Sequence, residues 1–258
     1  PMGWGRVFLI QFLNIAGLGP IFGAVMGAIY GPSAFLWIVF GTIFGGAVHD
    51  YFSGMLSLRN KGVSLPELGG KYMGKAFKQC MRVFTLFLMV LVGAVFIAGP
   101  AGLLAKLTPT TLDFTFWSVV IFIYYILATL LPIDKIIGKI YPLFGFALLF
   151  MAVGILVKMV WHWAPIPEVI PANLHNMHPT PDKYPIFPMM FISIACGAIS
   201  GFHATQSPMM ARCLKNEKQG RRIFSGAMVG EGLVALILAE AAMSFVGSAG
   251  GLQTLLAV

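Results

Sequence analysis

The chain has 258 residues, of which 58% are hydrophobic and only 10% are charged. Soluble domains carry about 25% charged residues, so this composition argues against a soluble domain and favours an integral membrane protein. The net charge of +8 does not indicate nucleic-acid binding, because the basic residues lie between apolar segments, where we expect them to face lipid headgroups.

The ends of the sequence and its cysteines carry less information. The sequence does not begin with Met and it stops in the apolar run 252–258, so we expect that it is cut at both ends. The absence of a visible signal peptide then means little. The three cysteines cannot all pair, and we interpret them as reduced thiols.

The apolar segments predict an all-α polytopic bundle. A bilayer core takes about 20 apolar residues per helix. The predicted spans, in chain order, are 6–29, 33–57, 83–104, 116–131, 141–161, 186–210 and 223–246. The third of these is expected to break at Gly99 and Pro100, and the stretch between the second and third spans is expected to be a basic loop.

The distribution of the basic residues predicts the orientation of the chain. With the N-terminus in the cytoplasm, 14 of the 17 Lys and Arg residues fall on the cytoplasmic side. Only Lys106, Lys158 and Lys183 fall outside. The opposite orientation contradicts the positive-inside rule, so the basic loops are expected to be cytoplasmic.

Two of the predicted spans are interrupted by glycines, at 15–20 and at 195–201. Gly17 and Gly197 are 180 residues apart, with five spans in the interval. An odd number of spans per unit inverts the second unit, which is typical of inverted-repeat transporters with discontinuous helices at the binding site. We therefore expect one transmembrane domain, 1–258, with a first repeat at about 6–161 and the start of a second at about 186–258. Ordinary close helix packing is the alternative explanation of such glycines.

Broken helices offer free backbone N–H groups and a positive dipole end to a carboxylate. In the sixth span this end consists of Gly201, Phe202 and His203, whereas Pro20 has no N–H to give in the first span. The predicted substrate site consists of Asn14, Gly17, Gly19, Gly197, Ser200, Gly201, Phe202 and Thr205. The alternative is that the small polar groups cap helices or hold them together.

Three titratable residues are expected at a common depth of about 10 to 12 Å from the cytoplasmic ends of their helices. They are Asp50, His203 and Glu231, and one of them is predicted to carry a coupling proton. Glu240 falls on roughly the opposite face of its helix from Glu231. His49 is expected to point elsewhere than Asp50 and is a secondary candidate. A static polar cluster is the alternative.

The segment 162–184 contains five prolines and three histidines and is expected to be an external connection, and a lid over the outer opening is one interpretation of it. Its histidine spacing is a poor metal signature, so we expect no metal site and no cofactor other than the proton.

Four stretches resemble the carbon starvation (CstA) family: IACGAISGFHATQSPMMA, NIAGLGPIFGAV, GGAVHDYFSGM and SLRNKGVSL. The resemblance implies a bacterial inner-membrane carrier that imports peptides or pyruvate with protons. It also implies a fold with five-plus-five inverted repeats, related to the APC-like transporters. Ile10 and Gln11 stand where many longer members have paired histidines, so no role of that pair can be transferred.

Taken together, these features predict a proton-coupled symporter linked to the carbon starvation response, and they leave open whether its substrate is a peptide or pyruvate. Two alternatives remain. A membrane-embedded enzyme would need a nucleophile–base or metal-ligand set, which the sequence does not display. A structural or assembly subunit of a membrane complex would not need buried carboxylates.

Overall fold

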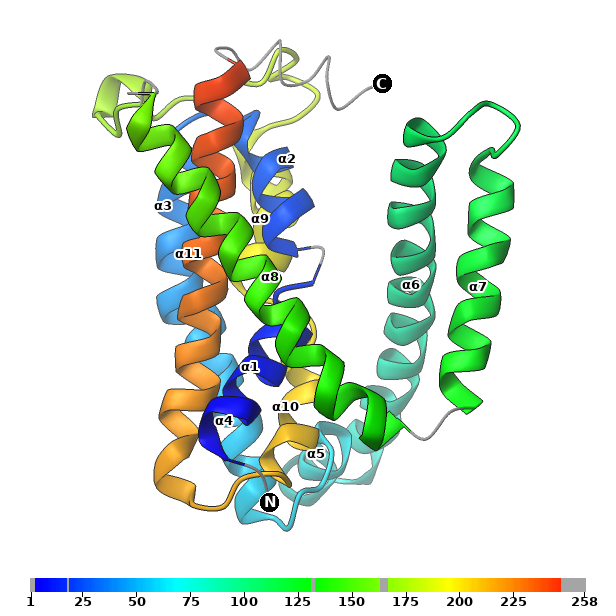
Figure 1. The fold of residues 1–258 in the computed structure, drawn as a ribbon. Coiled ribbons are helices and arrows are strands. Elements are labelled where there is room, and N and C mark those ends of the chain that lie inside the picture. The colour runs from blue at the N-terminus through cyan, green and yellow to red at the C-terminus, as the bar shows by residue number, and fades with distance from the viewer. Residues whose placement is uncertain (1–2, 18, 131–132, 163–166, 247–258) are drawn as a thin grey trace. The chain divides into compact units, whose positions relative to one another are not determined.

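The computed structural model describes residues 3–17, 19–130, 133–162 and 167–246, and these residues form helices and no strand (Figure 1). The chain divides into two compact units. The first comprises Pro1–Leu65 and Tyr141–Val258, and the second comprises Pro66–Ile140. This division is based on the contacts between residues. It does not test the predicted repeats, which stay a prediction.

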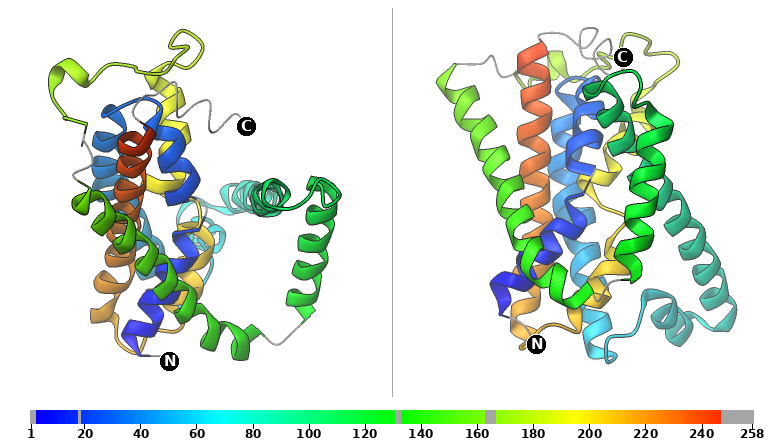
Figure 2. Two further views of the ribbon diagram at one scale, coloured as in Figure 1. Left: turned by 45° about the horizontal axis from the view of Figure 1, so that its top comes forward. Right: turned by 45° about the vertical axis from the view of Figure 1, so that its right-hand side comes forward.

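The first unit contains most of the helices. In chain order they are α1 (Trp4–Ile15), η1 (Gly19–Gly23), α2 (Ala24–Ala28), α3 (Ser33–Phe40), η2 (Gly41–Gly46), α4 (Ala47–Arg59), the part of α8 (Ile133–Trp161) that follows Ile140, η3 (Pro171–Asn173), η4 (Ile186–Met190), α9 (Phe191–Ala198), α10 (His203–Ala211), η5 (Glu217–Gln219) and α11 (Gly220–Val246). Helix α11 lies against α1, α2 and α4 (Figure 2).

Four helical stretches in the described ranges are long and apolar enough to cross a membrane: Ser33–Arg59, Lys75–Leu107, Leu143–Trp161 and Glu217–Ser244. Trp4–Ile15 and Gly19–Ala28 together pass the same test as one span bent by 52°. Phe114–Leu130 and Ile186–Ala195 are apolar but shorter. The chain is therefore a multi-pass, all-helical membrane protein, whereas the seven spans and the inverted repeat stay predictions.

Both glycine-rich interruptions are breaks in the structure. Helix α1 ends at Ile15 and η1 begins at Gly19. Helix α9 ends at Ala198 and α10 begins at His203. Between α9 and α10, Ser200 has a φ of 56°, a left-handed conformation that a side chain rarely adopts and that ends the helical hydrogen bonding.

The core of the first unit is rich in alanine. Where α2, α3, α9 and α11 meet, the fully buried residues include Ala24, Ala34, Ala198, Ala235 and Ala239. Small side chains allow close approach of helix backbones, which is how membrane helices gain packing energy. The interior of this unit is therefore built for close helix contacts.

The second unit contains α5 (Leu65–Met73), α6 (Lys75–Leu107) and α7 (Phe114–Leu130), together with the beginning of α8. The expected basic loop is thus partly wrong, because it contains α5 and the first turns of α6. The expected break at Gly99 and Pro100 is also wrong, since α6 continues through Pro100 to Leu107. Membrane helices tolerate a proline when the freed backbone groups find other partners.

An ion-pair cluster joins α5 to α6. The Glu67 carboxylate accepts from Lys78 and from Arg82, which lie four residues apart on one face of α6. Lys78 and Arg82 hold the pKa of Glu67 below its usual value. Two of the basic residues of this region thus form ion pairs within the second unit.

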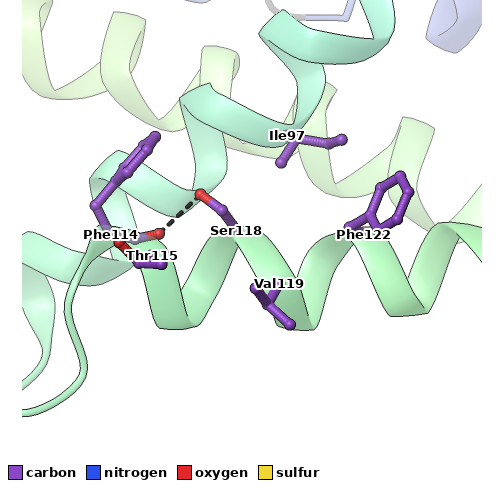
Figure 3. A pocket seen from close by; sticks show the side chains of 6 residues that line it. All are labelled: Ile97, Phe114, Thr115, Ser118, Val119 and Phe122. Carbon is purple, nitrogen blue, oxygen red and sulfur yellow. Dashed lines mark hydrogen bonds between the residues drawn. The ribbon is translucent and has the colours of Figure 1, made fainter.

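Helices α6 and α7 are antiparallel neighbours with an apolar hollow of about 340 Å³ between them. Figure 3 shows the residues that line it, which are Ile97, Phe114, Thr115, Ser118, Val119 and Phe122. The Ser118 hydroxyl donates to the Phe114 carbonyl at 2.7 Å, so it is used within its own helix. A hollow of this composition suits lipid chains better than a polar substrate.

Candidate functional site

The two broken helices meet at glycines. A Cβ atom built on Gly197 of α9 would stand 3.2 Å from the Gly19 carbonyl oxygen at the start of η1. A Cβ built on Gly46 would stand 2.6 Å from the carbonyl oxygen of Ala198, the last residue of α9. Glycine at these two positions lets η1 and η2 approach the break between α9 and α10.

The predicted substrate residues lie around this meeting point in different environments. Gly19, Gly197 and Ser200 are buried, Gly201 is exposed, and Asn14, Gly17, Phe202 and Thr205 are half-buried. The Ser200 hydroxyl accepts from the Phe202 N–H at 3.4 Å, and the Thr205 hydroxyl donates to the Phe202 carbonyl at 3.3 Å. Both hydroxyls are thus used locally in the break, and a substrate-binding role for these residues stays a prediction.

A buried hydrogen-bond network joins three helices. The Gln11 amide of α1 donates to Asp50 Oδ1 at 2.9 Å and Oδ2 at 3.1 Å, and it lies 3.0 Å from Ser207 Oγ. The Ser207 hydroxyl of α10 also donates to Asp50 of α4. All three side chains have no exposed surface. The three hydrogen bonds to the Asp50 carboxylate offset part of the cost of burying its charge.

His203 contacts a second histidine. His203 Nδ1 of α10 lies 3.1 Å from His49 Nδ1 of α4, with the ring centroids 5.1 Å apart. The expectation that His49 points elsewhere is therefore wrong. Adjacent residues on a helix are separated by about 100°, and α10 lies so close along α4 that His49 and Asp50 both reach it.

Glu231 of α11 has no exposed surface, and neither carboxyl oxygen has a hydrogen-bond partner among the described residues. It interacts electrostatically with Asp50. An isolated buried carboxylate is costly, so Glu231 is favoured as the neutral acid in this conformation. Glu240 is only half-buried, nine residues further along α11.

The sequence did not predict the π-helical segment η2, which lies within the helical stretch Ser33–Arg59. Its Gly41 lies against Ala198 and its Gly45 lies against Ile199, both next to the break in α9. Its Thr42 lies against Gly232, next to Glu231. Isolated π-helical turns occur frequently at functional sites. The sequence signal is the run of three glycines within 41–46 in an otherwise apolar span.

Gln11 and Ser207 were also missed as members of the site. Gln11 is an amide within an apolar segment, and Ser207 follows His203 by four residues, on the same face of a helix. Both signals are present in the sequence but are common in membrane helices. Within the described ranges, no group of three or more His, Cys, Asp or Glu side chains could hold a metal ion.

Known proteins similar to this chain are transporters or membrane proteins. An uncharacterized membrane protein of Haemophilus influenzae is 44% identical, covering 98% of this chain and 81% of that protein. The peptide transporter CstA of Campylobacter jejuni is 29% identical, covering 92% of this chain and 42% of that protein. The pyruvate/proton symporter BtsT of Escherichia coli is 28% identical, covering 90% of this chain and 41% of that protein.

The chain thus spans about two-fifths of the length of these two transporters. No solved structure matches it. The family model described as carbon starvation protein CstA matches residues 4–110 and 102–249. This match extends over nearly the whole chain, including both broken helices and the buried polar network, and the chain therefore belongs to the carbon starvation protein CstA family.

Proposed function

We propose that the protein imports a small carboxylate-bearing solute, a peptide or pyruvate, together with protons across the bacterial inner membrane during carbon starvation. The names of the relatives support a transporter with a substrate of this class. The observation that carries the proposal is the meeting of the two broken helices at Gly19 and Gly197. The basic loops would face the cytoplasm, as the positive-inside rule requires.

The substrate carboxylate would bind at the break in the sixth span. Helix α10 begins at His203, so its first N–H groups and its positive dipole end lie next to the exposed Gly201 and half-buried Phe202. Asn14 and Gly17 would contribute from the first broken helix. This arrangement suits an anion that both candidate substrates share.

The coupling proton would be held by one of the three buried residues Asp50, His203 and Glu231. These side chains are fully buried and come from α4, α10 and α11, of which α4 lies against both of the others. Ionisable groups are retained inside membrane proteins mainly for function, because their burial is costly. The alternative is a static cluster that holds the helices together.

The full-length protein reconstituted in liposomes tests the proposal. An internal pH dye would report acidification when pyruvate or a dipeptide is added outside, and labelled substrate would report uptake. Substrate-dependent acidification with one substrate supports the proposal and identifies the substrate. Conversion of the substrate without its accumulation would favour an enzyme. If neither substrate moves in the purified protein or in whole cells, the transporter proposal fails and a structural or assembly subunit is favoured.

A further inference from the structure

The contact between His49 and His203 determines which ring nitrogens carry hydrogen. The two Nδ1 atoms lie 3.1 Å apart, which is hydrogen-bonding distance. A neutral imidazole has one N–H donor and one bare acceptor nitrogen. One ring must therefore carry a hydrogen on Nδ1 and the other must accept it, so the two rings are opposite tautomers.

The two histidines differ in how deeply they are buried. His203 has no exposed surface, and its Nε2 has no hydrogen-bond partner among the described residues. His49 is only half-buried, on the same helix as the exposed side chains of Val48 and Phe52. The pair therefore connects a half-buried ring to an unpartnered nitrogen in the interior.

Two buried carboxyl groups lie on α4 and α11, and each can receive a proton only in its charged form. Asp50 lies next to His49 on α4 and Glu231 lies on α11, and both are fully buried. From α1, Gln11 contributes a neutral amide, and the described side chains of α10 and η2 contain no titratable group other than His203. Arg6 of α1 and Arg221 and Arg222 of α11 are exposed. The buried surroundings thus hold two carboxyl groups and no Lys or Arg.

We propose that His49 and His203 form a two-imidazole relay by which protons reach the buried carboxyl groups. This inference rests on the proposed function and adds His49 to it. A proton binds Nε2 of His49, and His49 then transfers its Nδ1 proton to Nδ1 of His203. His203 releases its Nε2 proton through water to a buried carboxylate in its charged form. One proton enters and one leaves, and both rings finish as the opposite tautomer.

This tautomer change limits the relay to one proton at a time. A second proton cannot follow in the same direction until both rings return to their starting tautomers. A relay of this kind therefore delivers one proton for each return of the two rings to their starting tautomers. A static helix contact between the same rings predicts no such dependence.

His49→Gln in the full-length protein tests the relay. Glutamine can keep a hydrogen bond to His203 but cannot pass a proton through its side chain. Two assays are compared, uptake driven by a pH gradient and exchange of labelled for unlabelled substrate without a gradient. We expect pH-driven uptake to fall at least tenfold and exchange to stay within twofold. His162→Gln, in an exposed histidine, is the matched control.

The outcomes separate the two proposals. If wild type moves no substrate, the proposed function fails. If wild type transports and His49→Gln keeps full pH-driven uptake, only the relay fails. Equal loss of both activities in folded His49→Gln also overturns the relay, since it indicates a structural role.

If His49→Gln does not fold, nitrogen spectra of ¹⁵N-histidine-labelled wild type decide. The relay requires opposite tautomers of the two rings that exchange as the pH is changed. Fixed tautomers over the pH range of transport would overturn it.

Discussion

The Gly19 carbonyl oxygen lies 3.2 Å from the place that a Cβ on Gly197 would take. Since that oxygen belongs to the backbone, it cannot move aside as the end of a flexible side chain can. An alanine at position 197 would therefore require the two broken helices to move apart by a few tenths of an ångström.

Gly197→Ala should destabilise the protein and weaken transport, even though alanine favours helix. The matched control is Gly154→Ala in α8, where a Cβ would meet nothing within 4 Å. Alanine is favoured over glycine in a helix by about 1 kcal/mol, so the control should be neutral or stabilising. Thermal unfolding of the full-length protein in detergent measures both. Equal midpoints would contradict the close contact.

Gln11→Leu should destabilise the buried network, because it removes both amide hydrogen bonds to Asp50. Leaving a buried carboxylate short of partners costs about 1–3 kcal/mol or more. Gln206→Leu is the matched control, since Gln206 is half-buried and precedes Ser207 directly. Chemical unfolding and pH-driven uptake of the two variants are compared. Similar behaviour of both would show that the Gln11 bonds contribute little.

The sequence predicts the membrane class, the two breaks and their glycines, because composition and interrupted apolar runs depend on local chemistry. It also places Asp50, His203 and Glu231 inside apolar helices, and all three are buried. These predictions need only the residue type and its position along a span.

The hydrogen-bond partners of the buried polar side chains could not be predicted, because they depend on how helices far apart in the sequence approach one another. Gln11 bonds Asp50 and Ser207 across 39 and 196 residues, and His49 reaches His203 across 154. The π-helical turn at Gly41–Gly46 likewise follows from close contacts with α9 and α11 and has no local signature beyond its glycines. Helix α6 shows the opposite case. Gly99 and Pro100 predict a break, but the helix continues through Pro100.

Glu231→Gln should retain the fold and abolish proton coupling. Glutamine has the shape of the neutral acid and carries no proton to release, so the buried site should tolerate it. Glu240→Gln is the matched control on the same helix, where the side chain is half-buried. Substrate-driven acidification should disappear in the first variant and persist in the second. Full acidification in Glu231→Gln would exclude Glu231 as the proton carrier.

The segment around His178 should loosen at acidic pH. His178 is 8% exposed, and its ring lies between Tyr30 and Tyr184, with centroid distances of 5.3 and 4.6 Å. Its Nδ1 accepts from the Thr180 N–H at 3.1 Å, which requires that nitrogen to be unprotonated. Burial lowers the pKa of His178 below its usual value of 6.5. The unfolded segment therefore binds a proton more readily than the folded one.

The stabilising contribution of neutral His178 is thus fully present above about pH 6.5 and is lost as the pH falls below that value. Hydrogen-exchange protection of the Thr180 amide, corrected for intrinsic exchange, should be constant from about pH 8 to 7 and should fall towards about pH 5. His178→Gln should remove this pH dependence, because its amide oxygen can accept the same bond without titrating. His175→Gln, in an exposed ring of the same segment, should leave it unchanged. Equal protection of wild type at pH 5 and pH 8 would mean that the His178 contacts do not hold the segment in place.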